Sequence, residues 1–115
     1  MIVVLGPTAT GKTHFAAFLA NALDREIISA DSRQVYRRMT IGSGKDYDDY
    51  VINGKVVPYH LVDIVEPGYE YNIFEYKRDF LKAYKDVLCR GKNVILCGGS
   101  GLYLESVMAN YRLDE

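Results

Sequence analysis

Short apolar runs alternate along this chain with longer stretches in which apolar residues recur at helical spacing. Apolar side chains dominate residues 2–5, 26–30 and 94–97, as in strands that are buried on both faces of a parallel sheet. Helical spacing follows the first run at residues 12–23 and precedes the last run at residues 72–90. This alternation predicts an α/β fold in which helices flank a parallel sheet.

The two predicted helices carry distinct signals. The first, residues 12–23, has an apolar stripe that we expect to pack into the core. The members of that stripe are Phe15, Phe18, Leu19, Ala22 and Leu23. The second helix is predicted to begin at a capping box, because Asn72 precedes Glu75 by three residues, and to end at Gly91.

Further elements are predicted between the two helices. Asn53 and Gly54 interrupt an apolar run and indicate a tight hairpin, which makes residues 46–58 a hairpin-like excursion. Residues 60–64 are the remaining strand candidate, and residues 33–39 can form a short helix. Four core strands are few for a doubly wound sheet, so we expect the sheet to be incomplete.

Composition narrows the class of protein. The 115 residues are 49% hydrophobic and can bury one core but not two. The 14 Lys and Arg residues nearly balance 15 Asp and Glu residues, so any nucleic-acid contact is expected to be local. No run approaches the ~20 apolar residues of a membrane span, and no membrane partner is expected. Cys89 and Cys97 lack metal-binding spacing and indicate buried, reduced thiols in a cytoplasmic protein.

The strongest local motif follows the first predicted strand. Residues 6–13, GPTATGKT, match the P-loop pattern GxxxxGK plus Ser or Thr, between a strand and a helix, which makes the fold P-loop NTPase-like. Backbone amides of such a loop bind phosphate oxygens, and the lysine reaches the terminal phosphate. We assign pyrophosphate or nucleotide binding to Gly6, Pro7, Thr8, Ala9, Thr10, Gly11, Lys12 and Thr13. The Thr13 hydroxyl is the expected ligand of a Mg²⁺ cofactor. The loop leaves open whether ATP or another diphosphate binds.

Two aspartates follow predicted strands, where parallel sheets bind ligands. Asp31 comes after residues 26–30 and is a candidate general base, with a helix cap as the alternative. Asp63 lies near the end of residues 60–64 and is a candidate magnesium ligand, with a structural hydrogen bond as the alternative. We interpret His14 and His60 as structural residues.

Four segments occur in a characteristic order and spacing, and together they span essentially the whole chain: GPTATGKT, SADSRQVYRRMTIGSGK, YHLVDI and CGGSGLYLESV. With these segments the chain resembles the N-terminal part of the tRNA dimethylallyltransferase, or tRNA isopentenyltransferase, family. The resemblance implies transfer of a dimethylallyl group from dimethylallyl diphosphate to the exocyclic amine of the adenosine beside the anticodon in tRNA. The P-loop would then hold the leaving pyrophosphate.

The resemblance also implies residue roles. The implied catalytic residues are Lys12, Asp31 and Ser100, where Asp31 matches the family's proton-accepting aspartate and Ser100 replaces its usual threonine. The implied tRNA-binding residues are Asp31, Ser32, Arg33, Gln34 and Lys45. Many relatives have GTAKP where this chain has GSGK at residues 42–45, and Lys45 keeps the positive charge.

The family's C-terminal half supplies a further pyrophosphate-binding arginine and a helical insertion that grips tRNA. These regions have no counterpart in this sequence, so we expect little transfer by the chain alone. A final helix is predicted at about residues 102–109. The sequence leaves open whether the chain is a natural truncation or a fragment, which tRNAs are modified, whether a free adenine nucleotide is the acceptor, and the oligomeric state.

Two other functions share parts of this pattern. A P-loop small-molecule kinase has the same fold and loop but does not account for DSRQVY followed by GGSGLY. A noncatalytic phosphate-binding module is the second alternative.

Overall fold

The computed structural model describes residues 2–5, 12–30, 36, 50–66 and 68–98. The elements in chain order are β1 (Ile2–Leu5), α1 (Lys12–Leu23), β2 (Glu26–Ser29), β3 (Val51–Ile52), β4 (Lys55–Val56), β5 (Tyr59–His60), α2 (Ile73–Cys89) and β6 (Val94–Gly98). Strand and helix alternate as the hydrophobic pattern predicts.

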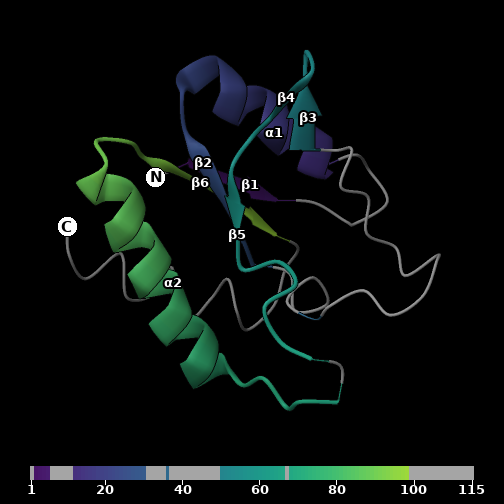
Figure 1. Cartoon of the computed structure of the whole chain (residues 1–115), viewed down its shortest axis with the longest axis vertical. Helices are drawn as coiled ribbons and strands as arrows, with labels where there is room; N and C mark the ends of the chain where they lie inside the picture. The colour runs from purple at the N-terminus through teal and green to yellow at the C-terminus, as the bar shows by residue number, and fades with distance from the viewer. Residues whose placement is uncertain (1, 6–11, 31–35, 37–49, 67, 99–115) are drawn as a thin grey trace.

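Four strands form one parallel sheet in the order β1-β6-β2-β5. The helix α2 lies on one side of this sheet, and α1 lies with the β3–β4 hairpin on the other side (Figure 1). Since β6 is inserted between β1 and β2, all five of its residues are buried. The predicted α/β fold with a parallel sheet flanked by helices is confirmed.

Alternate residues along the strands supply two separate cores, one on each face of the sheet. The core beneath α2 includes Ile28, Val94 and Leu96 from the strands and Tyr76, Phe80 and Val87 from the helix. The core beneath α1 includes Val4, Ile27 and Ile95 from the strands and Ala16, Ala17 and Ala20 from the helix. The period of two along each strand therefore divides its side chains between the two helices.

The prediction that the large apolar stripe of α1 packs into the core is confirmed for Leu19, which is half-buried against it, and wrong for the other four residues. Phe15 and Phe18 are each 54% exposed and Leu23 is 49% exposed. The residues that face the sheet instead are Ala16, Ala17 and Ala20, all fully buried. Small side chains let the helix axis approach the sheet closely, and helical spacing alone does not distinguish that face from the larger apolar one.

The Asn-Gly hairpin is confirmed. β3 and β4 pair antiparallel, and Asn53 and Gly54 have φ angles of 53° and 79°, as a tight hairpin turn requires. Tyr50 precedes this hairpin and stacks on Tyr59 of β5, with 4.1 Å between the ring centroids. The stack fixes the hairpin against β5, which is an edge strand of the sheet.

The strand predicted at residues 60–64 is wrong beyond its first residue. β5 ends at His60, and both Leu61 and Asp63 have positive φ angles, 66° and 59°, which an extended strand does not allow. The short helix predicted at residues 33–39 is wrong at Tyr36, which forms a parallel bridge with Val65. The rest of that segment lies outside the described residues.

α2 begins and ends as the sequence predicts. The Asn72 side chain accepts a hydrogen bond from the Glu75 backbone N–H at 2.9 Å, and the Asn72 N–H donates to the Glu75 carboxylate at 3.2 Å. Gly91 follows the C-cap with a φ angle of 79°. Capping therefore sets where α2 starts relative to the sheet.

Two further features concern the length of the helices and the burial of the cysteines. Neither α1 nor α2 has the length and apolar character needed to cross a membrane. Both cysteines are free thiols, but only Cys97 is buried, so the expectation of buried thiols is wrong for Cys89 on the last turn of α2.

Candidate functional site

The carboxyl ends of three strands meet at one edge of the sheet. In the register of the sheet, Leu5 of β1 pairs with Gly98 of β6, and Ser29 of β2 pairs with Cys97. Ala30 extends β2 by one residue, since its N–H donates to the Cys97 carbonyl at 2.8 Å. Parallel α/β sheets bind their ligands at this edge, which is therefore the candidate site.

The N-terminus of α1 contributes Lys12 and Thr13 to this edge, because the helix runs back along the sheet from the carboxyl end of β1. Lys12 is buried and Thr13 is half-buried in the first turn. The amide groups of such a first turn, together with the helix dipole, attract anions. Residues 6–11 of the predicted P-loop lie outside the described residues.

Tyr76 of α2 fixes the end of β2. Its side chain is fully buried, and its hydroxyl donates a hydrogen bond to the Ser29 carbonyl at 3.0 Å. Ser29 stands two residues before Asp31, so this bond restrains the backbone that leads to the candidate general base. The helical spacing of residues 72–90 does not predict the hydrogen bond that the Tyr76 hydroxyl makes. The signal that could have revealed it is a tyrosine at a position where phenylalanine fills a core equally well.

Gly98 is a second residue that sequence reasoning missed. A Cβ atom at this position would lie 2.8 Å from the Ala30 Cβ and 3.2 Å from the Ala30 carbonyl carbon and oxygen. β6 and β2 therefore come too close at the candidate site for any side chain at Gly98. Residues 99–101, which continue the glycine-rich segment and include Ser100, lie outside the described residues.

Gly98→Ala is expected to lower the free energy of unfolding by about 2 kcal/mol, because overpacking a tight contact shifts the backbone. Urea denaturation followed by circular dichroism measures this change. Adding Ala30→Gly to the same protein removes the nearest atom and should restore part of the lost stability. Equal denaturation midpoints for the parent and Gly98→Ala would contradict the close contact.

Asp63 does not occupy the predicted position at the end of a strand. β5 ends three residues earlier, and Asp63 is half-buried with a φ angle of 59°. Its role as a magnesium ligand stays a prediction. Within the described parts of the chain, no group of three or more His, Cys, Asp and Glu side chains could hold a metal ion. Mg²⁺ often takes only one or two protein oxygens besides substrate phosphates, so the Thr13 hydroxyl fits that chemistry.

The remaining predicted residues of the site fall where the structure gives no description. These residues are Asp31, Ser32, Arg33, Gln34, Lys45 and Ser100. The structure does place the two points from which most of them extend, namely the end of β2 and the end of β6. These points are adjacent in the sheet, because β2 pairs directly with β6.

A charged cluster lies at the opposite end of the sheet, next to the amino end of β2. The buried Glu26 carboxylate accepts hydrogen bonds from both terminal nitrogens of Arg90, the second at 2.9 Å, and lies 2.7 Å from Nε2 of His60. Hydrogen bonds from Arg90 lower the pKa of Glu26 to about 2, although burial alone would raise it. The cluster joins β2, β5 and α2 away from the candidate site, and the structural interpretation of His60 is confirmed.

Comparison with known proteins identifies relatives of the chain. Residues 34–115 match the family model for IPP transferase. The protein from Phocaeicola vulgatus named tRNA dimethylallyltransferase 2 is 65% identical over 113 residues, which make up 98% of this chain and 37% of that protein. The chain therefore spans little more than a third of the length of this curated relative.

Two solved structures agree with this result. The full-length tRNA isopentenylpyrophosphate transferase from Bacillus halodurans superposes with a TM-score of 0.80 at 36% identity, over 92% of this chain and 34% of that one. A eukaryotic dimethylallyltransferase acting on tRNA gives a TM-score of 0.79 at 30% identity, over 90% of this chain and 25% of that one. Because sequence and fold agree over most of its length, the chain belongs to the IPP transferase family.

Proposed function

We propose that this chain forms the part of a tRNA dimethylallyltransferase that holds the pyrophosphate and the acceptor amine. The complete enzyme would transfer a dimethylallyl group from dimethylallyl diphosphate to the exocyclic amine of the adenosine beside the anticodon. The observation that carries this proposal is the meeting of two features at one sheet edge: the α1 N-terminus with Lys12, and the end of β2 that leads to Asp31. Family membership favours this activity over a P-loop kinase.

The α1 N-terminus would stabilise the leaving group. The allylic carbon gains positive character as its bond to the diphosphate oxygen breaks, so catalysis depends on stabilising the departing negative charge. Lys12 and the amides of residues 6–13 supply that stabilisation. A Mg²⁺ ion held by Thr13 would neutralise further phosphate charge when bound. Asp63 is a second candidate ligand.

The end of β2 would hold the acceptor. Asp31 would accept a hydrogen bond from the adenine amine and take its proton as the nitrogen–carbon bond forms. Ser100, which follows β6, would contribute a hydroxyl beside the same edge. Ser32, Arg33, Gln34 and Lys45 would face tRNA. The complete enzyme would act on tRNA in the cytoplasm.

Lys12→Met is expected to weaken pyrophosphate binding at least roughly tenfold in the presence of Mg²⁺, because it removes a charge-assisted hydrogen bond. Methionine retains much of the aliphatic stem, so the buried position stays filled. Isothermal titration calorimetry with the purified chain measures the affinity, and melting curves verify that the variant is folded.

Lys85→Met is the matched control, since Lys85 is exposed on α2 and lies on the other side of the sheet from α1. Its pyrophosphate affinity should equal that of the parent. If Lys12→Met and the parent bind pyrophosphate equally well, the assignment of the phosphate site is wrong.

A further inference from the structure

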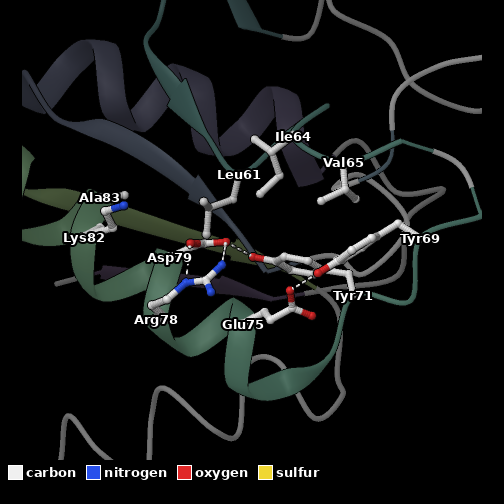
Figure 2. Close-up of a pocket in the computed structure, with 10 residues that line it drawn as sticks. All are labelled: Leu61, Ile64, Val65, Tyr69, Tyr71, Glu75, Arg78, Asp79, Lys82 and Ala83. Carbon is white, nitrogen blue, oxygen red and sulfur yellow. Dashed lines mark hydrogen bonds and ion pairs between the residues drawn. The ribbon is translucent and has the colours of Figure 1, made fainter.

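A pocket of about 480 Å³ opens between α2 and the residues that follow β5, on the side of the sheet that α2 covers (Figure 2). Its apolar wall consists of Leu61, Ile64 and Val65, which follow the carboxyl end of β5. The first turns of α2 form the opposite wall. Because β5 is parallel to the other strands, this pocket lies towards the same sheet edge as the phosphate site.

Tyr36 precedes the pocket residues in the chain and is bonded to two of them. Tyr36 pairs with Val65 in a parallel bridge, and its hydroxyl accepts a hydrogen bond from the Tyr71 backbone N–H at 3.4 Å. Tyr36 stands two residues after Gln34, the last residue of the candidate tRNA-facing segment. The proposed tRNA-facing segment is therefore separated by a single position in the sequence from a residue that bonds to the pocket lining.

The pocket combines aromatic and apolar surface with charged groups of both signs, because Glu75 and Asp79 line it beside Arg78 and Lys82. Tyr69 is 49% exposed and Ile64 is 37% exposed, which leaves ring and aliphatic surface accessible. Arg78, whose side chain is 62% exposed, and Lys82 provide two cations at the pocket. Unpaired nucleotides bind to such combinations, because a base packs on an aromatic face while the phosphate meets a cation.

Hydrogen bonds hold the two tyrosines in place across the pocket. The Tyr69 hydroxyl donates to Glu75, and the Tyr71 hydroxyl donates to Asp79 at 2.5 Å (Figure 2). Asp79 also accepts from Nε of Arg78 at 3.1 Å. The aromatic surface and the guanidinium group are thus positioned before any ligand binds, which lowers the entropy cost of binding.

We propose that this pocket is a second RNA subsite, which accepts an unpaired nucleotide of the acceptor RNA other than the reacting adenosine. The base packs against Tyr69 and the apolar wall, and the phosphate lies near Arg78 and Lys82. The inference rests on the proposed function, since it takes RNA as the acceptor.

The test uses the isotope-labelled chain and an unmodified anticodon stem–loop RNA, followed by NMR, which detects weak binding. RNA is expected to shift the amide signals of Tyr69 and Tyr71. Tyr69→Ala should weaken RNA binding at least roughly fivefold, because stacking on one aromatic side chain contributes ~1–3 kcal/mol per base. Arg78→Gln should weaken it and reduce its dependence on salt.

Phe74→Ala and Lys85→Gln are the matched controls. Phe74 is 78% exposed on α2, and neither residue lines the pocket. Both controls should bind RNA as the parent does. The absence of RNA-induced shifts at the pocket, or equal affinities for Tyr69→Ala and Phe74→Ala, overturns the subsite. Pyrophosphate titration of the same samples separates this result from failure of the proposed function, because that titration reports on the phosphate site alone.

Discussion

Glu26→Gln is expected to destabilise the protein by about 3 kcal/mol at pH 7, because it removes a buried carboxylate that pairs with Arg90 and lies within hydrogen-bonding distance of His60. Glutamine has nearly the same shape, so packing changes little. The lost interactions join the amino end of β2 to β5 and to the end of α2. They lie at the end of the sheet opposite the candidate site. Urea denaturation gives the free energy of unfolding of both proteins.

The effect of Glu26→Gln is expected to depend on pH in a defined direction. The pKa of Glu26 is about 2 in the folded protein, below the ordinary value of 4.5 that the unfolded chain has. A carboxyl group whose pKa is lower in the folded protein contributes its full stabilisation at pH values above its pKa in the unfolded chain. That stabilisation is lost as the pH falls from about 4.5 towards 2. The stability difference between parent and variant should therefore shrink over this range.

Asp86→Asn is the matched control for Glu26→Gln, since Asp86 is the other carboxylate bonded to Arg90, at 3.0 Å. The Asp86 side chain is exposed, so its removal should cost at most about 0.5 kcal/mol. Equal losses for the two variants would show that the buried carboxylate has no special role in the cluster.

The hydrophobic pattern predicted the fold well where one short segment of the sequence carries the whole signal. β6 was predicted because strands buried on both faces are apolar throughout, and α2 because Asn72 and Glu75 form a local capping box. The pattern failed on α1, where Phe15 and its neighbours compete with a face of alanines. Only the approach of the helix to the sheet selects between these faces.

The candidate site also has a part that local sequence patterns predict and a part that they do not. The P-loop pattern is local, so Lys12 and Thr13 were placed correctly at the start of a helix. The close approach at Gly98 and the bond from Tyr76 to Ser29 join residues far apart in the chain, and no local pattern encodes them. The pocket depends on a loop in which Leu61 and Asp63 adopt positive φ angles. The apolar composition of this segment predicts a strand, which these angles do not allow.

Asp31→Asn is expected to lower the rate of dimethylallyl transfer roughly 10²-fold or more, the usual contribution of a general base. Asparagine keeps the size and hydrogen-bonding reach of the side chain but cannot take the amine proton. The variant is made in a complete enzyme, obtained by exchanging this chain for the 113 aligned residues of the Phocaeicola vulgatus relative. Single-turnover transfer from labelled dimethylallyl diphosphate to unmodified tRNA measures the chemical step.

Binding of dimethylallyl diphosphate by Asp31→Asn should change little, because the proposed phosphate site is the α1 N-terminus and not the end of β2. Asp24→Asn serves as the control: Asp24 is exposed and bonded to Lys92 at 2.7 Å, next to the amino end of β2 at the opposite edge of the sheet. Its transfer rate should match that of the parent. A single-turnover rate for Asp31→Asn equal to that of Asp24→Asn, at saturating tRNA, would show that Asp31 is not the general base. A reduced rate with unchanged diphosphate affinity would show that Asp31 acts in the transfer step, on the amine proton or on the positive charge that develops at the allylic carbon.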